Sequence, residues 1–129
     1  MTPGDDLAPQ VYLVERSDLV RYAEASGDHN PIHQDEDVAR SVGLPGVIAH
    51  GMFTMALAAR AVETWTDGAE VLELGCKFTQ PVVVPADGSV EIEVAGEVKG
   101  ADDGLTTVAL TVTCDGQKVL GMPKAVVRA

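Results

Sequence analysis

Residues 51–64 form the most apolar stretch of the chain. Only Thr54, Arg60 and Glu63 interrupt it with polar side chains. A segment that is apolar nearly all round its circumference predicts a buried helix. At 1.5 Å per residue this helix would be about 20 Å long, roughly the width of a small sheet. The rest of the chain therefore has to supply a sheet that covers it.

The second half of the chain alternates apolar and polar residues, and this period of two predicts antiparallel strands. The expected strands are residues 72–78, 90–99, 106–114 and 119–127. Asp115-Gly116 is a strong signal for a two-residue hairpin turn between the last two. Pro123 places the final strand at an edge or a bulge. One long helix followed by such a meander predicts an α+β layer fold.

The first half is expected to hold a short strand and two helices around a loop. The strand is predicted at residues 10–15, after a loosely held arm at 1–9. Ser17 is the expected N-cap of a helix that Gly27 ends. A second, shorter helix is predicted at residues 35–42.

Between these helices lies the segment 26–33, Ser-Gly-Asp-His-Asn-Pro-Ile-His. Pro31 removes a backbone donor and drives Asn30 out of the α region, so the segment is a shaped loop. Such a loop can turn Asp28 and His33 toward one cavity. A carboxylate beside an imidazole that titrates near neutral pH suits proton transfer. The alternative is turn chemistry, which Asp and Asn often serve.

Composition narrows the class of protein. The 129 residues are expected to form a single domain, 1–129, and 46% apolar residues indicate a globular chain. A net charge of −11 argues against nucleic-acid and anionic-membrane partners, although a local basic patch could still hold a phosphate. The absence of a signal peptide and of a long apolar run predicts a cytoplasmic protein. Cys76 and Cys114 are expected to be buried free thiols.

Two motifs carry a family resemblance. Asp-x-Asn-Pro-Ile-His at 28–33, followed by Ile-Ala-His-Gly-Met at 48–52, resembles the MaoC-like hydratase/dehydratase family over almost the whole chain. The Val-Pro-x-Asp-Gly stretch at 84–88 is similar to that of HadB-type (3R)-hydroxyacyl-ACP dehydratase subunits. The segment 42–44, Val-Gly-Leu, departs from the many members with an aromatic residue there, which bears on the shape of the acyl pocket.

The resemblance implies a hot-dog fold, in which a sheet wraps a central helix, and dimers with active sites near the subunit interface. It also implies reversible hydration of trans-2-enoyl thioesters to (3R)-hydroxyacyl thioesters. In this chemistry His33 suits proton transfer at C2, and Asp28 suits handling of the water. The backbone N–H of Gly51, at a helix N-terminus, suits the thioester carbonyl oxygen. How Asp28 and His33 divide the proton steps stays open.

Three further residues are expected to support this site. Asn30 and Pro31 hold the loop, and His50 packs beside the start of the long helix. The chain also has the residue types of a metal site in Asp28, His29, His33 and His50. However, Pro31 denies the pair His29 and His33 the helical spacing that metal-binding helices use, so we expect neither a metal nor a cofactor.

Two other functions remain open at this point. One is a hot-dog thioesterase, in which a carboxylate drives water onto the thioester carbonyl. The other is a non-catalytic partner subunit of a heteromeric dehydratase, although retention of both Asp28 and His33 speaks against it. The expected substrate is an acyl thioester of CoA or acyl carrier protein. A homodimer is expected, with a heterodimer of two hot-dog subunits as the alternative.

Overall fold

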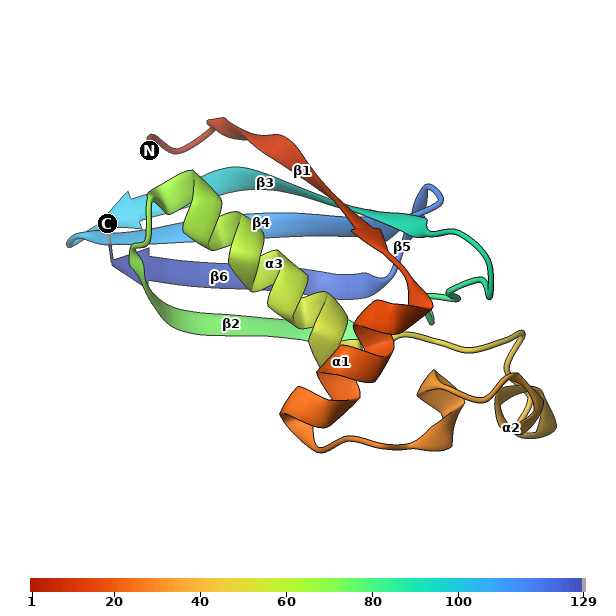
Figure 1. Cartoon of the computed structure of the whole chain (residues 1–129). Helices are drawn as coiled ribbons and strands as arrows, with labels where there is room; N and C mark the ends of the chain where they lie inside the picture. Colours follow the sequence, from red (N-terminus) through yellow and green to blue (C-terminus); the bar gives the residue numbers. More distant parts are fainter. Residues whose placement is uncertain (129) are drawn as a thin grey trace.

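A computed structural model describes residues 1–128 and places the strands in one twisted sheet (Figure 1). Five strands follow the order β1-β3-β4-β6-β2, and the short β5 pairs with β4. Every pairing between them is antiparallel, as the sequence predicted. The strand bounds are Asp6–Val14 (β1), Glu70–Phe78 (β2), Val90–Asp102 (β3), Leu105–Cys114 (β4), Gln117–Lys118 (β5) and Leu120–Arg128 (β6).

The helices lie against one face of the sheet and at one end of it (Figure 1). Their bounds are Arg16–Ser26 (α1), Glu36–Ser41 (α2) and Gly51–Thr66 (α3), with a 3-10 turn, η1, at Pro31–His33. The long helix α3 crosses the concave face of the sheet, so the predicted α+β arrangement is confirmed. The predicted range of α3 was two residues too short at its C-terminal end.

Within the single chain only one side of α3 is buried. Thr54, Ala58, Ala61 and Val62 are buried against the sheet, but Met52 on the other side is 56% exposed. One sheet can contact only one side of a helix, so the apolar character of the opposite side is not satisfied within this chain. The side that faces away from the sheet is the one that a second protomer is expected to cover.

The N-terminal elements begin earlier than the sequence predicted. Strand β1 starts at Asp6, because residues from Asp6 onward pair with β3. Helix α1 starts at Arg16, where Asp18 accepts a hydrogen bond from the backbone N–H of Glu15 at 2.8 Å. The prediction of Ser17 as N-cap was therefore wrong. Gly27 ends the helix as expected, with a left-handed φ of 82° that suits glycine.

Pro123 lies in a bulge, the second of the two positions predicted for it. Strand β6 is paired on both sides, with β4 and with β2, so it is not an edge strand. The register with β2 shifts between Gly75 and Lys77, and the pairing with β4 ends at Lys124. A residue without an N–H fits where the ladder is interrupted.

Both cysteines are free thiols within the described residues, as predicted. Cys114 is buried and Cys76 is half-buried, and desolvation raises the pKa of each thiol above its usual range. None of the helices in residues 1–128 combines the length and apolar character needed to cross a membrane.

Candidate active site

The loop between α1 and η1 has the extended shape that Pro31 predicts. Asn30 has φ −56° and ψ 123°, outside the α region, and its side chain accepts from the N–H of Ile32 at 3.2 Å. The backbone N–H of Asn30 in turn donates to Oδ1 of Asp28 at 3.2 Å. This turn fixes one carboxylate oxygen in the loop and leaves the other, Oδ2, directed toward His33.

His33 presents a basic nitrogen to that oxygen. Its Nδ1 lies 2.7 Å from the carbonyl oxygen of Ile48. A carbonyl can only accept, so Nδ1 carries the hydrogen and Nε2 keeps its lone pair in the neutral ring. Nε2 lies 4.0 Å from Oδ2 of Asp28, where the side chain of Asp28 is 52% exposed and that of His33 only 8%. The pair thus joins a buried imidazole to a carboxylate that solvent and ligands can reach.

His50 stands beside the start of α3, as expected, and contacts both members of the pair. Its ring stacks on His33 with 3.8 Å between centroids and 23° between planes. Its Nε2 donates to the backbone oxygen of Asp28 at 3.1 Å. Burial lowers the pKa of His50, which keeps this ring neutral at neutral pH. Within the described residues its Nδ1 has no hydrogen-bond partner.

Helix α3 opens at this site with free backbone donors. Within residues 1–128 no side chain caps it, and the N–H groups of Gly51 and Met52 have no acceptor. The N-terminus of a helix attracts negative charge through these groups and the helix dipole. A Cβ on Gly51 would lie 2.9 Å from the ring of Phe78. Glycine therefore allows Phe78 to lie close against the start of the helix.

A cavity of about 650 Å³ joins these groups, which is within the usual range for ligand pockets. Asp28, His50 and Gly51 line it, together with apolar residues that include Phe78 at the end of β2 and Leu120 at the start of β6. His33 is not among the lining residues, but its Nε2 faces the carboxylate of Asp28 and its ring stacks on His50, both of which line the cavity.

The cavity includes two residues that were not predicted as site residues. Phe78, at the end of β2, is 57% exposed and lines the cavity. Thr54 also lines the cavity and is 3% exposed. The single hydroxyl in an otherwise apolar stretch of helix could have indicated Thr54 as a site residue. Nothing in the sequence indicated Phe78, because its exposure depends on where the strand ends in space.

Three of the four residues considered as metal ligands lie close together. Asp28, His33 and His50 each offer a ligand atom, and these atoms lie within 4.8 Å of one another. His29 is exposed and outside the group. Pro31 prevents only a helical arrangement of His29 and His33, and the three residues here come together without one. Hydrogen bonds to carbonyls already occupy one nitrogen of each imidazole, which leaves at most one nitrogen from each ring. Whether a metal binds stays a prediction, tested below.

One sheet around a central helix, with a cavity at the helix start, defines a hot-dog domain. The chain belongs to the family described as MaoC like domain, which matches residues 2–115. The resemblance predicted from the two motifs is therefore confirmed.

Two relatives show the range of the similarity. The chain is 40% identical over 82 residues to 3-hydroxyacyl-thioester dehydratase X of Mycobacterium tuberculosis, covering 64% of this chain but only 29% of that protein. It is 32% identical over 117 residues to 3-hydroxybutyryl-CoA dehydratase of Methylorubrum extorquens, covering 86% of this chain and 74% of that protein. The chain thus spans less than a third of the first relative.

Solved structures confirm the hot-dog fold. The (R)-hydratase PhaJ1 from Pseudomonas aeruginosa, unliganded, superposes with a TM-score of 0.89 at 28% identity, covering 100% of this chain and 82% of that one. The truncated HadBC (3R-hydroxyacyl-ACP dehydratase) complex from Mycobacterium tuberculosis superposes with a TM-score of 0.76 at 17% identity, covering 98% of this chain and 96% of that one. At that identity the second likeness shows the fold alone.

Proposed function

We propose that this chain catalyses the reversible hydration of trans-2-enoyl thioesters to (3R)-hydroxyacyl thioesters of CoA or acyl carrier protein. One observation carries the proposal. Nε2 of His33, with its tautomer fixed by Ile48, faces Oδ2 of Asp28 across 4.0 Å at the edge of the cavity. The names of the family's relatives, which include hydroxyacyl-thioester and hydroxybutyryl-CoA dehydratases, support this reaction class.

The geometry suits each step of the reaction. A gap of 4.0 Å is too long for a direct hydrogen bond and suits a water or hydroxyl held by both groups. In dehydration, the Asp28–His33 pair takes the proton from C2, with the Asp28 carboxylate as the member that lines the cavity, and negative charge develops on the thioester oxygen. The free N–H of Gly51 faces the cavity where that oxygen would bind. The proton then passes within the Asp28–His33 pair to the leaving hydroxyl, and water departs with both groups in their starting states.

An absorbance assay with crotonyl-CoA tests this proposal and separates it from the thioesterase alternative. Hydration removes the conjugation between the double bond and the thioester, so the absorbance of the enoyl group should fall. A thiol reagent in the same mixture should detect no release of CoA. Thiol release without prior loss of the double bond would favour a thioesterase. No change in either signal, for enoyl-CoAs of increasing length and for enoyl-ACP, would favour a non-catalytic subunit.

Chelation should leave turnover unchanged, because the proposed steps use only Asp28, His33 and a backbone N–H. The measurement is turnover of crotonyl-CoA before and after dialysis against EDTA, with metal content determined in both samples. Loss of activity that zinc restores would contradict this prediction. It would then assign Asp28, His33 and His50, which lie within reach of one another, to a metal site.

Gly51→Val should lower kcat by about tenfold or more, because its side chain crowds the helix start where the thioester oxygen would bind. The melting temperature should fall less, since the Phe78 ring that the new Cβ meets is largely exposed and can move. Gly75→Val is the matched control, because a Cβ at Gly75 meets nothing within 4 Å. Equal losses of turnover and stability in Gly51→Val would make Gly51 a packing residue only.

A homodimer should form, because the side of α3 that faces away from the sheet is apolar and uncovered in the single chain. Met52 is 56% exposed there. Expressed alone, the chain should run as a dimer in light scattering and should turn over short enoyl-CoAs. An insoluble or inactive chain, rescued by co-expression with a second hot-dog protein, would indicate a heteromer instead. An active monomer would contradict both assemblies.

A further inference from the structure

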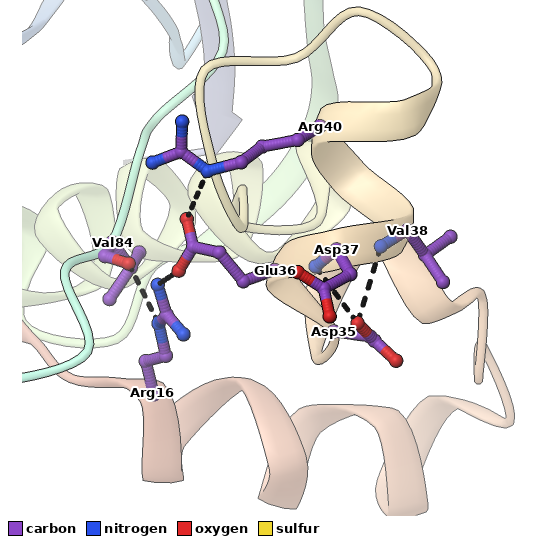
Figure 2. A network of polar contacts seen from close by, with 7 residues as sticks. All are labelled: Arg16, Asp35, Glu36, Asp37, Val38, Arg40 and Val84. Atoms are coloured by element: carbon purple, nitrogen blue, oxygen red, sulfur yellow. Dashed lines mark hydrogen bonds and ion pairs between the residues drawn. The ribbon is translucent and has the colours of Figure 1, made fainter.

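We propose that Arg16 and Glu36 are positioning residues for His33, acting through the carbonyl oxygen of Ile48. The inference rests on the proposed function, because it concerns the same imidazole. Figure 2 shows the two side chains between α1, α2 and the segment that precedes β3. Neither residue touches the cavity, so a direct contact with substrate is not part of the inference.

Arg16 holds two parts of the chain at once. Its Nη2 donates to Oε2 of Glu36 at 2.5 Å, and its Nε donates to the backbone oxygen of Val84 at 2.9 Å. The fork of donors on one guanidinium makes this double contact possible, and a lysine could not reproduce it. Arg16 therefore ties α2, through Glu36, to the segment around Val84, although 68 residues separate Arg16 from Val84 in the sequence.

The environment of Glu36 indicates that this contact is built in. The hydrogen bond from Arg16 holds the pKa of Glu36 below its usual range. A Cβ at Gly46 would lie 2.6 Å from Oε1 of Glu36, so only glycine lets the carboxylate approach the backbone here. Arg40 reaches the same carboxylate at 3.6 Å, but its side chain is 64% exposed, against 24% for Arg16. Arg16 is thus the more buried of the two partners and the closer to the carboxylate.

Residues 47–49 are hydrogen-bonded to the segment around Val84 on one side and to η1, which precedes α2, on the other. The N–H of Val84 donates to the oxygen of Val47, and the N–H of Ala49 donates to the oxygen of Val82, both at 2.9 Å. From the η1 side, the oxygen of Ile32 accepts from the N–H of Ile48 at 3.2 Å.

The position of the Ile48 oxygen depends on both sides of this segment. That oxygen accepts the Nδ1–H of His33 at 2.7 Å and so sets which nitrogen of the ring is basic. Loss of the Arg16 guanidinium would remove its hydrogen bonds to Val84 and Glu36 together. The carbonyl group of Ile48 could then shift away from the His33 ring. A shift of about 1 Å in a catalytic group can lower the rate by up to 100-fold.

Arg16→Met tests the inference, with Arg40→Met as the matched control on the same carboxylate. We expect Arg16→Met to lower kcat by about tenfold with KM changed by less than about twofold. Arg40→Met should stay within about twofold of wild type in both constants, since an exposed pair contributes little. Glu36→Ala should resemble Arg16→Met, and Glu36→Gln, which keeps an oxygen for Arg16, should recover most of kcat.

A second measurement does not depend on activity. The Nδ1–H of His33 is buried and hydrogen-bonded, so it should give a slowly exchanging proton signal in NMR. The signal can be assigned to His33, because His50 donates through Nε2 and His29 is exposed. The signal should weaken or vanish in Arg16→Met and Glu36→Ala but persist in Arg40→Met. If wild type lacks hydratase activity yet shows this pattern, the proposed function fails and the positioning role stands.

Two results would overturn the positioning role. One is an unchanged kcat and an unchanged His33 signal in folded Arg16→Met or Glu36→Ala, even if the melting temperature falls. The other is an equal loss of kcat in Arg40→Met. If Arg16→Met does not fold, Glu36→Ala and Glu36→Gln decide the question, because Glu36 lies at the surface end of the pair.

Discussion

Asp28→Asn should lower kcat/KM by about 100-fold or more, which corresponds to about 2.7 kcal/mol of lost transition-state stabilisation. The substitution keeps Oδ1, which accepts the N–H of Asn30, so the loop retains its shape. It replaces Oδ2, which faces His33, with an amide that cannot accept a proton. The melting temperature should change little, because the Asp28 side chain is half-exposed. Steady-state kinetics on crotonyl-CoA and a thermal melt check both expectations.

Asp35→Asn is the matched control for that experiment. Oδ1 of Asp35 accepts the N–H groups of Asp37 and Val38 at the start of α2, so it makes the same kind of turn contact in the next loop. Asparagine replaces aspartate at such caps with little loss. We expect activity and stability close to wild type. Near-normal turnover in a folded Asp28→Asn protein would remove Asp28 from the proposed mechanism, whereas equal losses in both variants would indicate a general effect of loop charge.

Features set by local sequence were predictable. The apolar run at 51–64 and the Pro31 loop each depend on neighbours within a few residues, and both agree with the structure. The prediction of Ser17 as the N-cap of α1 was wrong, although serine is a residue type that this position favours. The choice depends on the geometry of Asp18 rather than on residue type.

Contacts between distant residues were not predictable from the chain alone. The tautomer of His33 depends on Ile48, fifteen positions away, and Arg16 reaches Glu36 and Val84 across 20 and 68 positions. Periodicity reports which side of an element is buried, but not which residue of another element it meets. Motif recognition supplied the pair Asp28 and His33, and the structure supplies the partners that orient them.

The uncovered side of α3 bears on the cavity as well as on assembly. Met52 and Phe78 are both exposed and both line the cavity. A second protomer that covers α3 would therefore also close part of the cavity wall. Such a dimer would account for the large apolar side chains at the mouth of a pocket that also holds the groups of the proposed reaction.

His33→Asn should lower kcat by about 100-fold or more, because it removes the Nε2 lone pair with which the Asp28–His33 pair holds the C2 proton. Asparagine can still donate to the oxygen of Ile48, so this variant preserves more of the local structure than His33→Ala, which also removes the stack on His50. We therefore expect similar kcat values for the two variants but a lower melting temperature for His33→Ala. The double variant with Asp28→Asn should be little worse than the poorer single variant, because the two groups act on one proton path. Multiplied losses in the double variant would mean that Asp28 and His33 act independently, and a His33→Asn protein with near-normal kcat would show that the C2 proton goes to another group.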